Sequence, residues 1–117
     1  MADRFSTGTN IIRMVRGDTH TFNVTIEDDI DEEGIYRLTD ADTLYLGIML
    51  PHQKFEDAVI RKKFSKGDQD DCGNISVTVE PEDTIDLDPG VYYYAVKLVR
   101  GEIVNTVINK TKFVIFD

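Results

Sequence analysis

The sequence predicts an all-β protein with the architecture of an immunoglobulin-like antiparallel β-sandwich of about seven strands. Apolar and polar residues alternate with period two along most of the chain, and no segment sustains a helical period. Turn residues recur at intervals of about 8–12 residues, as in sandwiches. A length of 117 residues suits one domain that spans residues 1–117, and neither a repeat nor a linker interrupts it.

Seven segments fit strands in chain order. In the second segment, Phe22, Val24 and Ile26 point one way and polar residues the other, which indicates a strand with one solvated face. The fourth contains Arg-Lys-Lys, a common protection of a sheet edge against pairing with another chain. Pro81 favours one helical turn between the fifth and sixth segments. The expected strands are residues 10–15, 20–27, 43–50, 58–64, 75–79, 91–100 and 103–116.

Two of these strands are apolar on both faces. In segment 43–50, Tyr45, Gly47 and Met49 alternate with inward leucines and isoleucine. In the last strand, Val114 and Phe116 alternate with two inward apolar residues. A strand that is apolar on both faces is expected to be covered on both sides, by the domain's own loops or by a neighbouring molecule. The candidate interface residues are therefore Tyr45, Met49, Val114 and Phe116.

A turn with proline and glycine precedes the long strand 91–100. Pro89 and Gly90 lead into this strand, and its first inward residue is Tyr92. In immunoglobulin-like sandwiches a tyrosine at such a corner bonds the upstream backbone and fixes the loop. Pro89, Gly90 and Tyr92 are thus predicted to form a structural corner.

Charge and cysteine content restrict the partners. The chain has 13 basic and 22 acidic residues, a formal net charge of −9, which disfavours nucleic acid as a partner. The single cysteine, Cys72, excludes an intrachain disulfide. No signal sequence and no apolar run of membrane-spanning length is present, so we expect synthesis in the cytoplasm and no membrane partner.

No group of residues predicts an enzyme. The two histidines, His20 and His52, and the thiol of Cys72 do not form a recognisable nucleophile–base arrangement. Residues 68–73 begin like a calcium loop, but position five is Cys72 and position twelve is Val79, where a bidentate glutamate is required. We expect no catalytic residues, no cofactor and no metal, with a looser calcium site among the acidic loops as the alternative.

An ordered series of short motifs resembles one protein family. In order along the chain they are RGDTHTF (16–22), LTDAD (38–42), KKFSKGD (62–68), ISV (75–77), PEDT (81–84), LDPGVYYY (87–94) and VKL (96–98). The series resembles small phage and prophage tail or baseplate proteins of Gram-positive bacteria, like the N-terminal domain of upper baseplate proteins. The resemblance implies a non-enzymatic structural or adaptor protein of the virion. Its partners would be other tail or baseplate subunits or further copies of the chain.

A second hypothesis comes from another functional class. A sandwich of this size also suits a carbohydrate- or ligand-binding module of a bacterial surface protein. Such a module would use exposed aromatic rings, and the candidates are Tyr36, Tyr45 and Tyr93.

Overall fold

The predicted all-β sandwich is confirmed. The computed structural model describes residues 5–6, 11–28 and 34–117. Its helical segments are one short α-helix and two 3₁₀ turns. The elements are β1 (Phe5–Ser6), β2 (Ile12–Val15), β3 (His20–Thr25), β4 (Glu27–Asp28), β5 (Asp42–Met49), η1 (Phe55–Asp57), β6 (Ile60–Phe64), η2 (Lys66–Asp68), β7 (Asn74–Val79), α1 (Pro81–Thr84), β8 (Gly90–Arg100) and β9 (Ile103–Phe116).

The strands form one large and two small sheets. The large sheet has the order β2-β9-β8-β5-β6, and β3 pairs with β7 in a second layer. β1 and β4 form a short third pair. The β2–β9 pair is parallel, which corrects the prediction of a purely antiparallel fold. Alternation of apolar and polar residues does not predict whether two neighbouring strands are parallel, because both strand directions give the same period of two.

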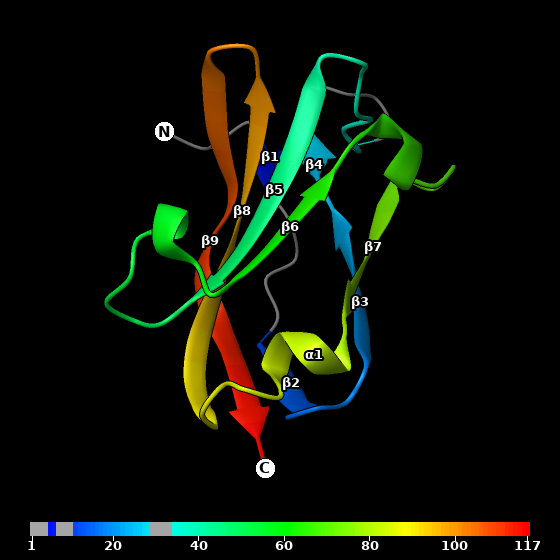
Figure 1. The fold of residues 1–117 in the computed structure, drawn as a ribbon. Helices are drawn as coiled ribbons and strands as arrows, with labels where there is room; N and C mark the ends of the chain where they lie inside the picture. The colour runs from blue at the N-terminus through cyan, green and yellow to red at the C-terminus, as the bar shows by residue number, and fades with distance from the viewer. Residues whose placement is uncertain (1–4, 7–10, 29–33) are drawn as a thin grey trace.

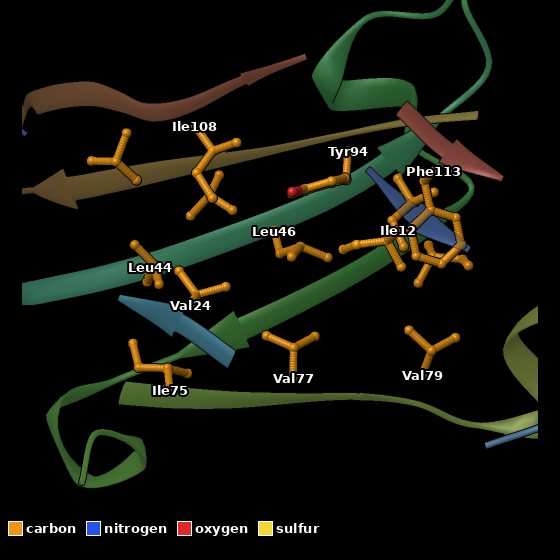
Figure 2. Close-up of a cluster of buried hydrophobic side chains, with 14 of the residues drawn as sticks. Ile12, Val24, Leu44, Leu46, Ile75, Val77, Val79, Tyr94, Ile108 and Phe113 are labelled. Atoms are coloured by element: carbon orange, nitrogen blue, oxygen red, sulfur yellow. The ribbon is translucent and has the colours of Figure 1, made fainter. Parts of the chain in front are cut away.

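The core lies between the large sheet and the β3–β7 pair, which face each other across the molecule (Figure 1). Figure 2 shows Leu44 and Leu46 of β5 pointing toward Val24, Val77 and their neighbours on the opposite layer. These side chains are buried, as alternation predicted for each strand. Burial of alternate residues on both layers closes the sandwich through the hydrophobic effect.

The β8–β9 hairpin is the longest feature of the large sheet. Its strands pair from Gly90 opposite Ile115 to Arg100 opposite Ile103. The first central residue of the turn, Gly101, has φ +58°, whereas the second, Glu102, does not have a positive φ. This combination fits the type II′ turn that the sequence predicted. An irregularity in the register opposite residues 94–97 allows consecutive residues of β9 to face the core.

β6 is an edge strand, as its basic residues predicted. Lys62 points inward and its ammonium lies 2.7 Å from a carboxylate oxygen of Asp83 on α1. Burial is the largest single effect and raises the pKa of Asp83. The hydrogen bonds from Lys62 and from the Glu80 backbone, together with the charge of Lys62, outweigh it, and the pKa is lowered overall. An inward charge that needs its own partner discourages a further strand from pairing here.

Of two other predictions, one differs in detail from the structure and one is confirmed. The segment 20–27 is divided, because β3 ends at Thr25 and β4 pairs with β1 instead of β7. The helical turn at Pro81 is present as α1. Thr84, at its end, is fully buried and accepts a hydrogen bond from the backbone N–H of Gly17, which fixes α1 to the turn between β2 and β3.

The predicted corner brings a hydroxyl back to the preceding turn. The Tyr92 hydroxyl donates a hydrogen bond to the carbonyl oxygen of Asp88 at 2.7 Å, and the ring is buried. Gly90 has φ +152°, a conformation that other residues rarely adopt. Burial, followed by the nearby charge of Asp88, raises the pKa of Tyr92, so the phenol keeps its proton and its role as donor.

We expect Tyr92→Phe to lower the free energy of unfolding by about 1 kcal/mol, because it removes one hydrogen bond and leaves the ring in place. Tyr93→Phe, at the neighbouring outward position, is the control and should change stability by less than about 0.5 kcal/mol. Urea unfolding of the three proteins measures both values. Equal stability of Tyr92→Phe and the native chain would show that the corner bond contributes nothing.

Candidate functional site

The large sheet has an outer face, defined as the side turned away from β3 and β7. It consists of the strand residues that alternate with the core residues. The register aligns them in rows across the strands. All four candidate interface residues lie on this face. Its rows are Lys63–Tyr45–Lys97–Thr106, Arg61–Gly47–Ala95, Met49–Tyr93–Lys112, Arg13–Val114–Val91 and Val15–Phe116.

The prediction of Met49 as an exposed interface residue is wrong. Its side chain is 0% exposed, although it lies on the outer face and outside the main core. The connection between β5 and β6, residues 50–59, passes over this part of the sheet on the side away from β3 and β7 (Figure 1). Coverage by the domain's own loop was one of the two alternatives for this strand. Tyr45, four residues earlier, is half-buried and lines a surface pocket.

Three contacts hold this connection, which we call the 50–59 loop, on the sheet. Phe55 lies against Gly47, where an added Cβ would be 3.0 Å from Cε2 of that ring. The Lys97 ammonium sits 4.6 Å from the centre of the Phe55 ring, a cation–π contact. From the other side, the Lys110 ammonium donates a hydrogen bond to the Gln53 carbonyl at 3.1 Å. The absence of a side chain at Gly47 provides the space into which Phe55 fits.

The other two candidates lie at the C-terminal end of the outer face and remain open. Phe116 is 43% exposed and Val114 is half-buried. The domain's own loops therefore leave this end of the last strand open, and of the two alternatives for it, coverage by a neighbouring molecule stays a prediction. Val15, in the row of Phe116, and Val91, in the row of Val114, are each 45% exposed. We call Val15, Val91, Val114 and Phe116 the apolar strip.

The outer face is also basic. Among the described strand residues, no outward position of the five strands carries an acidic side chain, although the chain has 22 acids. Basic residues occupy outward positions on four of the strands. They are Arg13, Arg61, Lys63, Lys97 and Lys112. In the described chain the acidic side chains lie in loops, turns and short helices, apart from Glu27 and Asp28 of β4 and the buried Asp42 of β5. Charge is therefore segregated between the sheet face and its surroundings.

A pocket of about 350 Å³ opens on this face between the 50–59 loop and β6. Tyr45 and Phe55 form apolar walls, and Arg61 and Lys63 supply cations. Both cations are exposed, and neither has a carboxylate partner in the described part of the chain. Glu56 of η1 also lines the pocket and is the one acidic group there.

The most buried charge in the described chain is a structural group at the hairpin end of β5. The Asp42 carboxylate has 0% exposure and accepts hydrogen bonds from Arg100 Nε at 2.9 Å, from the Tyr36 hydroxyl at 2.6 Å and from the Thr39 backbone at 2.8 Å. Arg100 Nη2 also donates to the Tyr36 hydroxyl. Burial raises the pKa of Asp42, but these hydrogen bonds outweigh it and lower the pKa to about 2.

This network closes the end of the sandwich and engages the Asp42 carboxylate completely. Every oxygen of the Asp42 carboxylate is occupied by donors from its own chain. Gln69 holds the same loop, because its side chain bonds the Leu38 N–H and the Tyr36 carbonyl. Tyr36 is therefore buried and engaged, and it is lost as a candidate sugar-binding ring.

The residues considered for catalysis or metal binding are dispersed. Cys72 is exposed, and within the described ranges no three His, Cys, Asp or Glu side chains approach closely enough to hold an ion. In the segment that begins like a calcium loop, Asp70 accepts hydrogen bonds from the backbone N–H groups of Cys72 and Asn74. Asp68 accepts one from Ser65. These carboxylates shape turns, which accounts for their spacing.

No protein-family model matches the chain, and no curated protein matches its sequence. For the described residues, we find no helix with the length and hydropathy needed to cross a membrane.

Sequence reasoning missed the 50–59 loop, the basic outer face and the Asp42 network. The first had a signal in Gly47, a glycine inside a strand, which often marks a close approach of other chain segments. The second required the register, because the basic residues of separate strands become a surface only when the strands are paired. The third joins residues 58 positions apart, and local pattern gives no information about it.

We expect Gly47→Val to detach the 50–59 loop while β5 persists, because valine favours strands and its side chain would overlap Phe55 and Ala58. Limited trypsin digestion should then cleave after Lys54 at least about tenfold faster than in the native chain. Thr43→Val, at an outward position of the same strand, is the control and should leave cleavage unchanged. Equal cleavage rates for native protein and Gly47→Val would refute this account of the loop.

The low pKa of Asp42 makes its contribution pH-dependent. An unfolded aspartate has a pKa of about 3.9, and Asp42 in the fold has a pKa of about 2, so its ionised form stabilises the fold above about pH 4 and loses this effect as pH falls toward 2. Asp42→Asn should lower the unfolding free energy by roughly 2 kcal/mol at pH 7. The difference from native protein should shrink between pH 4 and 2 in urea titrations. Asp40→Asn, exposed in the same turn, serves as control; a difference that stays constant with pH would contradict the assignment.

Proposed function

We propose that this chain is a non-enzymatic structural or adaptor protein of a phage or prophage tail or baseplate, and that it works through subunit contacts of its outer sheet face. The apolar strip is the observation that carries the proposal. Three apolar side chains on neighbouring rows, Val15, Val91 and Phe116, remain exposed to solvent there, and Val114 between them is half-buried. The opposite face of these strands forms the core. Covering such a strip with another protein removes apolar surface from water and favours association.

The position of the strip supports a role in assembly. It lies on β2, β8 and β9, which are paired strands in a sheet and therefore a rigid surface. Arg13 adjoins Val114, so a cation borders the apolar residues. An apolar centre with a charged border is the usual anatomy of a protein interface, and rigid strands limit the entropy lost on binding.

The virion setting rests on the ordered motifs of the sequence. They fall on the elements that build the sandwich: the first joins β2 to β3, and LTDAD (38–42) contains the Asp42 carboxylate. LDPGVYYY (87–94) contains the corner formed by Tyr92. Because these motifs have structural roles, the resemblance concerns the architecture of the domain. From this resemblance we expect the partners to be tail or baseplate subunits.

The carbohydrate-binding alternative retains one supporting observation. Tyr45 and Phe55 form walls of the pocket on the outer face, where a sugar ring could stack. Tyr93 is half-buried on the same face. Binding of the chain to a glycan array, abolished by Tyr45→Ala, would favour this alternative over the adaptor.

The test is whether the chain occurs in assembled particles. We expect antibodies against it to label the tail or baseplate of phage particles induced from the encoding strain. In a strain lacking the gene, complementation with Phe116→Ser should lower the amount of chain in purified particles at least about tenfold, because the apolar contact is removed. Ile103→Ser, at the exposed hairpin end of β9, is the matched control. Absence of the native chain from particles would refute the proposal.

A further inference from the structure

The pocket beside Tyr45 differs chemically from the apolar strip and calls for a different ligand. It lies on the outward rows toward the hairpin end of the large sheet, where Lys63 and Lys97 flank Tyr45 on adjacent strands. Neighbouring strands are about 4.8 Å apart, so the flanking cationic residues are attached within about 10 Å of each other. No outward acid offsets them along these strands, as described above.

The two exposed cations of the pocket are available. Lys62 points inward to Asp83, and Lys97 lies on the Phe55 ring, so both have partners. Arg61 and Lys63, in contrast, extend outward from the edge strand and have no ionic partner in the described chain. An arginine and a lysine one outward position apart bind carboxylate oxygens well, because the guanidinium offers paired donors and the ammonium adds charge.

We propose that this basic pocket binds a carboxylate side chain on an acidic segment of the protein that covers the outer face. The inference deepens the proposed function and rests on it for the identity of the partner as a tail or baseplate subunit. Charge complementarity selects the ligand: the pocket is the basic surface of an acidic chain, and its volume of about 350 Å³ suits a side chain.

The surroundings favour a protein ligand over nucleic acid. A nucleic-acid backbone requires a continuous basic track, and the 50–59 loop interrupts the rows of the sheet with Glu56 and Asp57. The apolar strip on the same face gives a protein partner a second contact, whereas it offers nothing to a phosphate backbone. Glu56 lines the pocket itself, so its charge should weaken binding of any carboxylate.

A labelled hexaglutamate peptide tests the pocket on the full chain by fluorescence anisotropy. We expect binding at about 20 mM salt that weakens at about 200 mM, because exposed charges are screened. Lys63→Glu and Arg61→Glu should each weaken the affinity at least about tenfold, and Glu56→Gln should strengthen it by about threefold. The glutamate variants still carry a charge on the edge strand, so the edge stays protected against pairing with another chain. If Lys63→Glu does not fold, Lys63→Gln, which removes the charge without reversing it, replaces it.

Lys66→Glu is the matched control, because it changes the net charge equally at an exposed position on η2, outside the outer face. Equal loss of affinity in Lys66→Glu and Lys63→Glu would overturn the proposal, as would absence of binding at low salt. Tighter, Lys63-dependent binding of a single-stranded DNA dodecamer would overturn the choice of ligand. If the chain binds the peptide but is absent from phage particles, only the proposed tail or baseplate function is refuted. If it is present in particles but does not bind the peptide, only the proposed carboxylate-binding pocket is refuted.

Discussion

The packing of the β3–β7 pair against the inner face of the large sheet is the constraint on which the rest of this structure depends. Leu44, Leu46 and Ile48 are buried by it, and they alternate with outward residues along β5. A shift of one residue would exchange the two sets and place the apolar residues in water. The core therefore fixes the outer face as well, since the register that buries Leu46 also places Tyr45 between two lysines.

The outer face has three regions, and their arrangement depends on Gly47, which has no side chain. Gly47 leaves a depression into which Phe55 fits, and the 50–59 loop buries Met49 beneath it. To one side of the loop the surface is basic and contains a pocket, and toward the C-terminus it is apolar and open. A partner that covers the whole face would meet charge and apolar contacts in separate places, which gives directional binding from a simple strand pattern.

Alternation predicted the core because burial on one face of a strand depends on local sequence. The edge position of β6, the turn at Gly101 and the bond from Tyr92 were predicted for the same reason, since each arises from a few adjacent residues. Met49 was misplaced because a second apolar face looks the same whether a loop or a partner covers it. The bond between Asp42 and Arg100 was missed because it depends on which strands are neighbours.

The same distinction applies to charge. A net charge of −9 describes the whole chain and its long-range attraction for other macromolecules. At physiological salt, however, exposed charges are screened over about 8 Å, and the molecule is 23 Å across its shortest axis. A ligand in the pocket of the outer face therefore responds mainly to the charges of Arg61, Lys63 and Glu56, and little to acids on the far side. An acidic protein can thus present a cationic interface, and the sheet register determines where that interface lies.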